Sequence, residues 1–519
     1  MLQQLLSVLS IVIFLGAIGY SVYTQQVNAP AVVEQQSALD LRRSVFKIRV
    51  TSETSDFKHP WKKTPAGKSS GSGFYIGEGR IMTNAHVVAN GTYITVQRDG
   101  DAKPLPATVE HVAHDCDLAL LKVNPDDLGK VTTMTFGGLP KLRSPVATIG
   151  YPKGGEQISI TAGIVSRVGY RTYVHAGDRQ HLLVQVDSAI NGGNSGGPVV
   201  QKDRVVGVAF QAFTNAENTG YIIPTPVVNR FLDDVKDGHY DGHPQDGLWV
   251  NEWTTNNPSL VTFNQLNQDE QGIQVTHVSP WSPLQKDIMP GDILLSIDGN
   301  LIGSDGKVDF KGERVDFRTL FDLKQIGDQV AFTLMRQGDR KSFQAKIDPI
   351  KKHYESSNVY TFRPKYFVYG GIVFTTLSRS YLRSWGSRWY RQAPFLLRYA
   401  DAYTDFMEDL ADEEEIVIIS DRLPHPLNAY AEHVYHEIVA SVNGQKVNGI
   451  EHLARLLEGG TDPMVVVDFV GNMRPLVLER PLVTKHNTSI NQQYQVIPDR
   501  WFAEVDGTAK GEWHDKKGH

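Results

Sequence analysis

The chain has 519 residues, of which 40% are hydrophobic and 21% charged, and its formal net charge at pH 7 is −6. This composition is ordinary for a globular protein, and the length predicts several domains. The weakly acidic balance gives no general reason to expect nucleic acid as a partner. The single cysteine, Cys116, excludes an internal disulfide and a cysteine-rich zinc site. Because the 17 histidines are scattered without ligand spacing, we expect neither a metal nor a cofactor.

The N-terminal segment is almost continuously apolar over residues 5–23, and the first charge in the chain is Glu34. Such a stretch is long enough to cross the hydrocarbon layer of a bilayer, which takes about 20 residues. No clear cleavage site follows, because Ala29 runs into Pro30. We therefore expect an uncleaved membrane anchor over 1–25 and a polar linker over 26–39, with a cleaved signal peptide as the alternative. No basic residue precedes the span, so its orientation is poorly specified.

From residue 40 to 238, short strands and Gly, Asn or Asp turns recur at a spacing typical of an all-β fold. Three polar residues punctuate this region. His86 follows a strand in TNAHVV, Asp117 opens the apolar run DLALLKV, and Ser195 lies in the turn NGGNSGGP. Each residue alone has a structural explanation. Together, in this order, they match one of the known orders of a serine protease triad.

The chemistry of a serine nucleophile explains the glycines around Ser195. Its hydroxyl attacks only when a base removes the proton and backbone N–H groups stabilise the oxyanion. Glycines allow the sharp turn that brings the N–H groups of Gly193 and Ser195 to one point. Asp115 and Asp117 lie on one face of the same strand, so spacing alone does not choose the partner of His86.

The motifs TNAHVV, DLAL, GNSGGP and GYIIPT (residues 220–225) resemble the HtrA (Deg) family of serine proteases, and in particular its plant Deg branch with two PDZ domains. The resemblance covers roughly residues 40–482. It implies a mainly β fold, with a trypsin-like double β-barrel followed by two PDZ-like α+β domains. It also implies that His86 is the general base, that Asp117 orients it and that Ser195 attacks. By the same resemblance Gly193, Asn194 and Ser195 form the oxyanion hole.

Two further positions bear on mechanism within this resemblance. Trypsin-like enzymes usually carry Asp before the nucleophile, ready to pair with a new N-terminus, whereas this chain has the uncharged Asn194. We therefore expect activation by loop ordering rather than by trimming. Six residues before the serine, trypsin carries an Asp for basic substrates, and this chain has Ala189. With Ile190 and Phe210 nearby, we expect a small apolar specificity pocket.

Two C-terminal regions resemble PDZ domains. The first, over 245–348, contains GIQVTHVSPWSP and MPGDILLSIDG, and the second, divergent region over 352–482 contains YGGIVF and IVASVNGQKVNGIEHLARLLEG. PDZ domains bind peptide C-termini or extended strands by adding a strand to a sheet edge. A packing domain that binds no ligand is the alternative. An Arg- and Trp-rich insertion in the second region is followed by an acidic run, so nucleic acid is again not expected. Residues 485–519 are interpreted as a polar tail.

The motifs and the family resemblance together predict an ATP-independent serine endopeptidase regulated by its PDZ domains, and the resemblance alone implies that its substrates are unfolded or damaged proteins. The alternative is a protease-fold chaperone or scaffold whose active site rests inactive. The family resemblance implies a homo-oligomer, a trimer or a multiple of trimers. From the apolar N-terminal segment we expect an inner-membrane anchor with the protease facing the periplasm, or a soluble periplasmic protein after signal cleavage.

Overall fold

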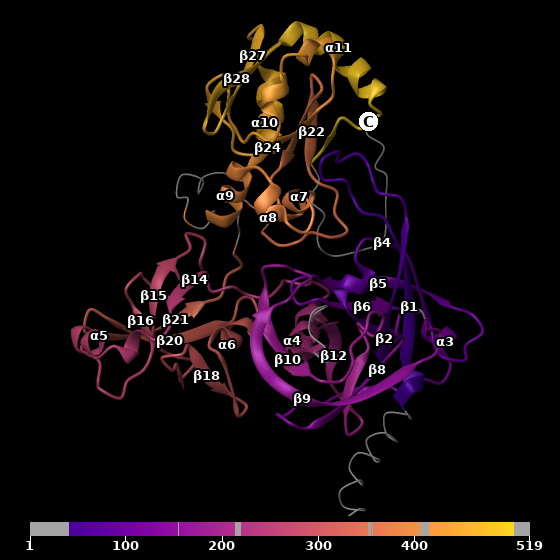
Figure 1. Ribbon diagram of the computed structural model, residues 1–519, viewed down its shortest axis with the longest axis vertical. Helices are drawn as coiled ribbons and strands as arrows, with labels where there is room; N and C mark the ends of the chain where they lie inside the picture. Colours follow the sequence, from indigo (N-terminus) through magenta and orange to yellow (C-terminus); the bar gives the residue numbers. More distant parts are fainter. Residues whose placement is uncertain are drawn as a thin grey trace, which may run out of the picture.

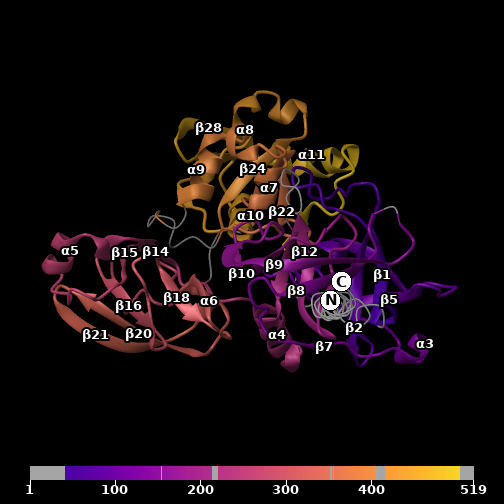
Figure 2. The same ribbon diagram turned by 60° about the horizontal axis from the view of Figure 1, so that its bottom comes forward.

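The computed structural model describes residues 41–153, 155–212, 220–350, 354, 356–403, 406 and 415–502. The expected N-terminal anchor and linker lie outside these residues. Within the described ranges, no helix is both long enough and apolar enough to cross a membrane. The described chain forms a double-barrel body and two smaller α+β bodies, which both views separate clearly (Figure 1, Figure 2).

The first barrel is a closed ring of six antiparallel strands in the order β1-β2-β3-β6-β5-β4. Apolar residues alternate along its strands and fill its interior, as Ile48, Val50 and Val96 do. Its elements are β1 (Val45–Ser52), β2 (Gly67–Gly77), β3 (Arg80–Thr83), α2 (Ala85–Val88), β4 (Gly91–Gln97), β5 (Leu105–Ala113), β6 (Leu118–Lys122) and α3 (Pro125–Leu128).

The second barrel follows directly. Its sheet has the order β11-β8-β9-β10-β13-β12-β7, and the additional pairing of β11 with β12 closes six of these strands into a ring. The expected double barrel is confirmed. The elements are β7 (Thr135–Phe136), β8 (Pro145–Gly150), β9 (Ser159–Thr172), β10 (Gln180–Val186), β11 (Pro198–Gln201), β12 (Arg204–Ala212), β13 (Gly220–Pro224) and α4 (Thr225–Asp234).

The first α+β body contains a sheet in the order β14-β15-β16-β20-β21, which leaves β14 at an edge. Its core is built from apolar strand residues such as Ile273, Leu294 and Phe332. The elements are β14 (Leu248–Asn251), α5 (Pro258–Phe263), β15 (Ile273–Val278), β16 (Ile293–Ile297), β17 (Asn300–Leu301), β18 (Lys307–Phe310), β19 (Glu313–Asp316), α6 (Arg318–Asp322), β20 (Gln329–Arg336) and β21 (Asp339–Lys346).

The second α+β body has two four-stranded sheets, β24-β23-β22-β29 and β26-β25-β27-β28. Its elements are β22 (Tyr366–Tyr369), β23 (Ile372–Thr376), α7 (Arg379–Arg383), α8 (Trp389–Gln392), α9 (Phe395–Tyr403), β24 (Val417–Arg422), β25 (Val439–Val442), β26 (Gln445–Lys446), α10 (Ile450–Gly459), β27 (Met464–Phe469), β28 (Asn472–Glu479), α11 (Arg480–Gln493) and β29 (Arg500–Trp501).

The expected polar tail differs from the structure over residues 485–502. Helix α11 continues to Gln493, and β29 pairs with β22, so this stretch belongs to the second α+β body. Ile490 and Val496 are buried against β22 and β23, although the helix as a whole is polar. A few apolar anchors in a polar sequence explain why composition alone suggested a tail.

Both α+β bodies contact the barrels. Asp322 of α6 bonds to His181 of β10, and residues 356–363, which precede β22, bond to several segments of the double-barrel body.

Candidate active site

His86 and Asp117 meet at the edge of the first barrel. His86 lies in α2, directly after β3, and its Nδ1 is 2.6 Å from Asp117 Oδ2. The backbone N–H of His86 also donates to Asp117 Oδ1 at 2.7 Å, so both carboxylate oxygens are held. Asp117 is fully buried and has a positive φ of 55°, an uncommon backbone state for a residue other than glycine. Asn84 fixes this turn by donating to the carbonyl of Asp117 at 2.9 Å.

The environment shifts the pKa of both partners. Burial by itself would raise the pKa of Asp117, but the adjacent His86 and its hydrogen bonds lower it below the usual value. Burial would lower the pKa of His86, and the Asp117 charge outweighs burial and raises it. The carboxylate is therefore ionised and stabilises positive charge on the imidazole ring.

Asp115, the other candidate from the sequence, points elsewhere. Its carboxylate accepts hydrogen bonds from Tyr240 Oη at 2.6 Å and from the N–H of His243 at 2.9 Å. Asp115 is half-buried and belongs to a polar cluster with Tyr240 and His243. The structure thus brings Asp117 to His86 and directs Asp115 away from it.

Ser195 lies in the turn before β11, and its hydroxyl donates to the carbonyl of Phe210 at 3.2 Å. Among the described residues, no hydrogen bond joins Ser195 Oγ to His86. Catalytic hydrogen bonds are often long in ligand-free proteases and form only with substrate. A rotation of the serine side chain is needed before the imidazole can take its proton.

The backbone around Ser195 requires its glycines. Gly193 and Gly196 have φ values of 99° and 85°. A Cβ on Gly193 would lie 2.3 Å from the Tyr151 carbonyl oxygen, and one on Gly196 would lie 2.2 Å from that of Ser72. No side chain fits at either position, which explains the glycine-rich sequence in physical terms.

The turn also presents two backbone donors. In the part of the chain that the structure describes, the N–H groups of Gly193 and Ser195 donate to no protein acceptor, whereas the N–H of Asn194 donates to the Asn191 carbonyl at 3.0 Å. An incoming oxyanion can therefore be bound by the first two groups. Asn194 is buried, and its side-chain oxygen has no hydrogen-bond partner among the described residues.

Ser72 of β2 holds the nucleophile turn and was not found by sequence reasoning. Its Oγ donates to the Gly193 carbonyl at 2.7 Å and accepts from the Tyr151 N–H at 2.8 Å. Its own N–H donates to the Ser195 carbonyl at 2.8 Å. A fully buried serine between two glycines, in GSGF, is the signal that points to such a role.

A second group of residues that the sequence did not predict lies beside His86. The rings of His175 and His86 have centroids 6.0 Å apart, and His175 Nε2 is 2.9 Å from His114 Nδ1. Burial lowers the pKa of His175 to about 3 and that of His114 to about 4, so both rings are neutral. Tyr360, from the segment before β22, stacks on His175. No sequence pattern links these residues, because they come from separate segments.

The residues expected to line the specificity pocket occupy two environments. Ala189 is half-buried, and its carbonyl accepts from Thr161 Oγ1 at 3.2 Å. Ile190 is buried in the core of the second barrel, and Phe210 packs against Tyr173 with ring centroids 4.6 Å apart. Gly220 packs directly against Ile190, because a Cβ at position 220 would lie 2.8 Å from the Ile190 side chain.

Known proteins resemble this chain over most of its length. Residues 71–208 match a model of the trypsin-like peptidase domain, and residues 356–500 match a PDZ domain model. "Protease Do-like 2, chloroplastic" of Arabidopsis thaliana is 34% identical over 92% of this chain and 77% of its own. "Protease Do-like 4, mitochondrial" of the same plant is 33% identical, over 80% of this chain and 76% of its own. A solved structure, "HtrA-type protease AlgW with tripeptide", is 24% identical over 60% of this chain and 96% of its own, with a TM-score of 0.48.

The expected localisation is corrected by these findings. We expected an inner-membrane anchor facing the periplasm, but the names of these relatives place them in chloroplasts and mitochondria. The apolar segment on which the expectation rested lies outside the described residues, and a spanning helix is lacking within them.

Three findings indicate the same family. They are the similar relatives, the two matched domain models, and the double barrel followed by PDZ-like bodies. This chain belongs to the HtrA/Deg family of serine proteases.

Proposed function

We propose that the chain is an ATP-independent endopeptidase that cleaves unfolded or damaged polypeptides, with Ser195 as nucleophile, His86 as general base and Asp117 as the residue that orients it. The observation that carries this proposal is the 2.6 Å contact between His86 Nδ1 and the buried Asp117 carboxylate, beside a serine turn with two free N–H donors.

The proposed reaction begins when a substrate places its carbonyl carbon over Ser195. The Ser195 hydroxyl leaves the Phe210 carbonyl and turns to His86 Nε2, which accepts its proton as Oγ attacks. Asp117 stabilises the resulting imidazolium, and the N–H groups of Gly193 and Ser195 bind the oxyanion. His86 then returns the proton to the leaving amine, and water hydrolyses the acyl-enzyme by the same steps.

The hydrogen bond from Ser195 to Phe210 favours a second, related state in which the site rests inactive until a ligand reorganises the turn. Peptide C-termini or extended segments at the edge strand β14 are the proposed activating partners, because strand addition needs an unpaired edge. We also propose that the protein acts as a homo-oligomer.

A fluorophosphonate probe tests both parts, since it labels a serine only when the nucleophile is activated and the oxyanion hole is formed. We expect labelling of the wild type and none of Ser195→Ala, while Ser70→Ala on the exposed part of β2 labels normally. Casein hydrolysis by Ser195→Ala should fall to background, because residual catalysis without the triad is only about 10³-fold over water. Labelling that requires an added peptide would identify the resting state, and labelling of Ser195→Ala would contradict the assignment.

A further inference from the structure

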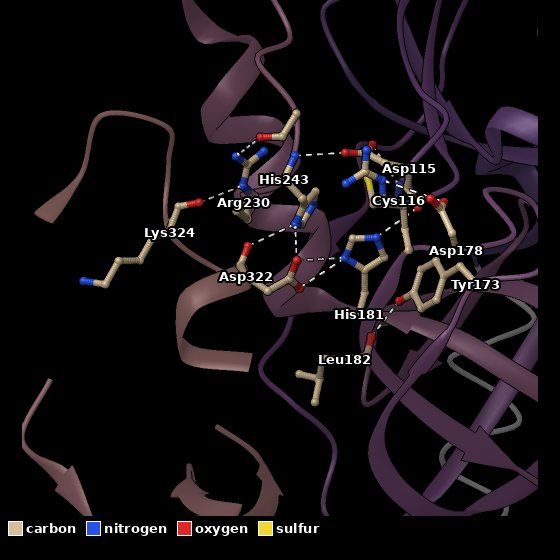
Figure 3. Close-up of polar contacts among 12 residues, drawn as sticks. Asp115, Cys116, Tyr173, Asp178, His181, Leu182, Arg230, His243, Asp322 and Lys324 are labelled. Atoms are coloured by element: carbon tan, nitrogen blue, oxygen red, sulfur yellow. Dashed lines mark hydrogen bonds and ion pairs between the residues drawn. The ribbon is translucent and has the colours of Figure 1, made fainter. Parts of the chain in front are cut away.

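Two histidines and one aspartate converge in a buried position between the second barrel and the first α+β body. His181 comes from β10, His243 from the segment after α4, and Asp322 from the end of α6. Figure 3 shows the two imidazole rings directed at the Asp322 carboxylate from different sides. All three residues are buried, and one ligand atom from each lies within 4.8 Å of the others.

The donor atoms form a compact triangle. Asp322 Oδ1 is 2.9 Å from His181 Nδ1 and 3.0 Å from His243 Nδ1. In a tetrahedral zinc site, with bonds of about 2.0–2.2 Å, neighbouring donors are roughly 3.3 Å apart. The two sides that meet at Asp322 Oδ1 therefore need to open by only a few tenths of an ångström, and one ligand atom from each residue lies within 4.8 Å of the others.

The outer atoms of the two rings differ. His181 Nε2 lies 3.0 Å from the Asp115 carbonyl, the kind of partner that usually holds the second nitrogen of a metal-bound histidine. His243 Nε2 is buried and has no hydrogen-bond partner among the described residues. The hydrogen bonds of the His243 ring therefore all involve Nδ1, which lies 3.0 Å from both the carboxylate and the backbone carbonyl of Asp322.

The charges around the triangle favour a dication. Asp322 is a buried carboxylate and Asp115 a half-buried one, while the Arg230 guanidinium is paired with Asp234. Two carboxylates thus lie beside the imidazole rings, and the nearby guanidinium is already paired, so the cluster offers negative charge to a cation.

An open coordination position is available beside the triangle. A cavity of about 460 Å³ adjoins His181, His243 and Asp322, and it can supply a water molecule as the fourth ligand. Two imidazoles and one carboxylate with a water form a donor set suited to zinc or a similar transition-metal ion.

We propose that His181, His243 and Asp322 bind one divalent transition-metal ion, with Zn²⁺ as the best match, and that this ion joins the protease barrels to the first PDZ-like body. The site is separate from the proposed triad and does not depend on it. The ligands come from three distant segments, which explains why the spacing of histidines in the sequence gave no metal motif.

The test is a Zn²⁺ competition titration of the full-length protein, after EDTA treatment and dialysis, against a chromogenic chelator. We expect one tight site per chain in the wild type. His243→Gln and Asp322→Asn should weaken that site at least 100-fold, while His239→Gln, at an exposed histidine four residues away, should leave it unchanged. Circular dichroism establishes that each variant is folded.

A second readout is thermal unfolding with and without Zn²⁺. The ion should raise the Tm of the wild type and of His239→Gln, and leave the Tm of His243→Gln unchanged. His243→Gln removes only the Nδ1 contacts with Asp322, because His243 Nε2 has no partner among the described residues. The proposal is overturned if the wild type has no tight site, or if His243→Gln and Asp322→Asn bind Zn²⁺ as tightly as the wild type.

Discussion

The ring of Tyr360 stacks on the ring of His175, with centroids 4.0 Å apart and an angle of 16° between the planes. The Tyr360 hydroxyl also donates to the His175 carbonyl at 2.9 Å, and Asn358 Nδ2 donates to the same oxygen at 2.7 Å. Since His175 packs near His86, the segment leading to the second PDZ domain contacts the wall of the proposed active site. A movement of that domain can therefore be transmitted through Tyr360 and His175 to His86, the proposed base.

Removing the Tyr360 ring should disturb His86 through His175. Tyr360→Ala is expected to lower kcat/KM for a peptide substrate up to about 10-fold, the equivalent of the ~0.5–1.5 kcal/mol of a stacked pair. Tyr360→Phe keeps the ring, and Asn358 still bonds to the His175 carbonyl, so its kcat/KM should stay within about twofold. The pH profile of kcat/KM separates a change in the position of His86 from a general loss of stability. Only a change at His86 moves the acidic limb of the profile. Equal losses in both variants would show that the ring contact is unimportant.

The two aspartates near His86 should have different roles. Asp117→Asn is expected to lower kcat by roughly 10⁴, because the amide favours the wrong imidazole tautomer. Asp115→Asn should leave kcat within a few-fold and reduce stability by about 1–3 kcal/mol, since a buried acceptor of several hydrogen bonds is altered. Steady-state kinetics with urea unfolding of each variant distinguishes the two effects. A large loss of kcat in Asp115→Asn alone would contradict the assignment.

Local features predicted an all-β fold and the serine turn, whereas the double barrel was implied by the family resemblance. Alternating apolar residues define the strands, and Gly193 and Gly196 occur where no Cβ fits. The contact between His86 and Asp117 was expected only through the family resemblance, because Asp115 and Asp117 were expected on one face of a strand. The structure corrects this: both lie in the turn between β5 and β6. Contacts between separate segments, such as Tyr360 on His175 or Asp322 on His181, leave no periodic signal and needed the structure. The expected membrane anchor rested on hydropathy in residues outside the described ranges.

Ser72 should support both the fold and the oxyanion hole. Ser72→Ala removes the donor to the Gly193 carbonyl and leaves the Tyr151 N–H buried without its acceptor, which costs about 1–3 kcal/mol. Fluorophosphonate labelling should slow, since Gly193 loses one constraint on its peptide orientation. Ser70→Ala, two positions away on the same strand and exposed, is the matched control and should change neither property. Normal labelling and stability in Ser72→Ala would show that the backbone alone holds the turn.

A pH-dependent ion pair joins the protease body to the second PDZ domain. His59 Nε2 is 2.6 Å from Asp421 of β24, and its Nδ1 is 3.2 Å from Asp56. The hydrogen bonds to Asp421 and Asp56 raise the pKa of His59 to about 9, while His59 helps to lower that of Asp56 to about 2. His59 is therefore protonated at neutral pH and loses its proton as the pH rises through about 9.

The sign of this linkage follows from the raised pKa. Stability from His59 is fully present below its unfolded pKa of about 6.5 and is lost as pH rises through about 9. Because the groups are partly exposed, we expect a loss on the order of 1 kcal/mol. Urea unfolding of the wild type and His59→Gln at pH 6 and pH 9.5 measures it as a difference between the two proteins. A difference that does not shrink at the higher pH would contradict the raised pKa.

The specificity pocket provides the last prediction. Ala189 offers no carboxylate to a basic side chain, and an unpaired cation buried there would cost several kcal/mol. Mass spectrometry of digested β-casein should therefore show cleavage after small or medium aliphatic residues such as Val, Ala, Ile and Leu. Ala189→Asp should move cleavage towards Lys and Arg at reduced overall activity, because the added carboxylate is costly when the pocket is empty. Ala189→Ser adds a polar atom without charge and should keep the aliphatic preference. A wild-type digest dominated by cuts after Lys or Arg would show that another residue, not position 189, sets the charge of the pocket.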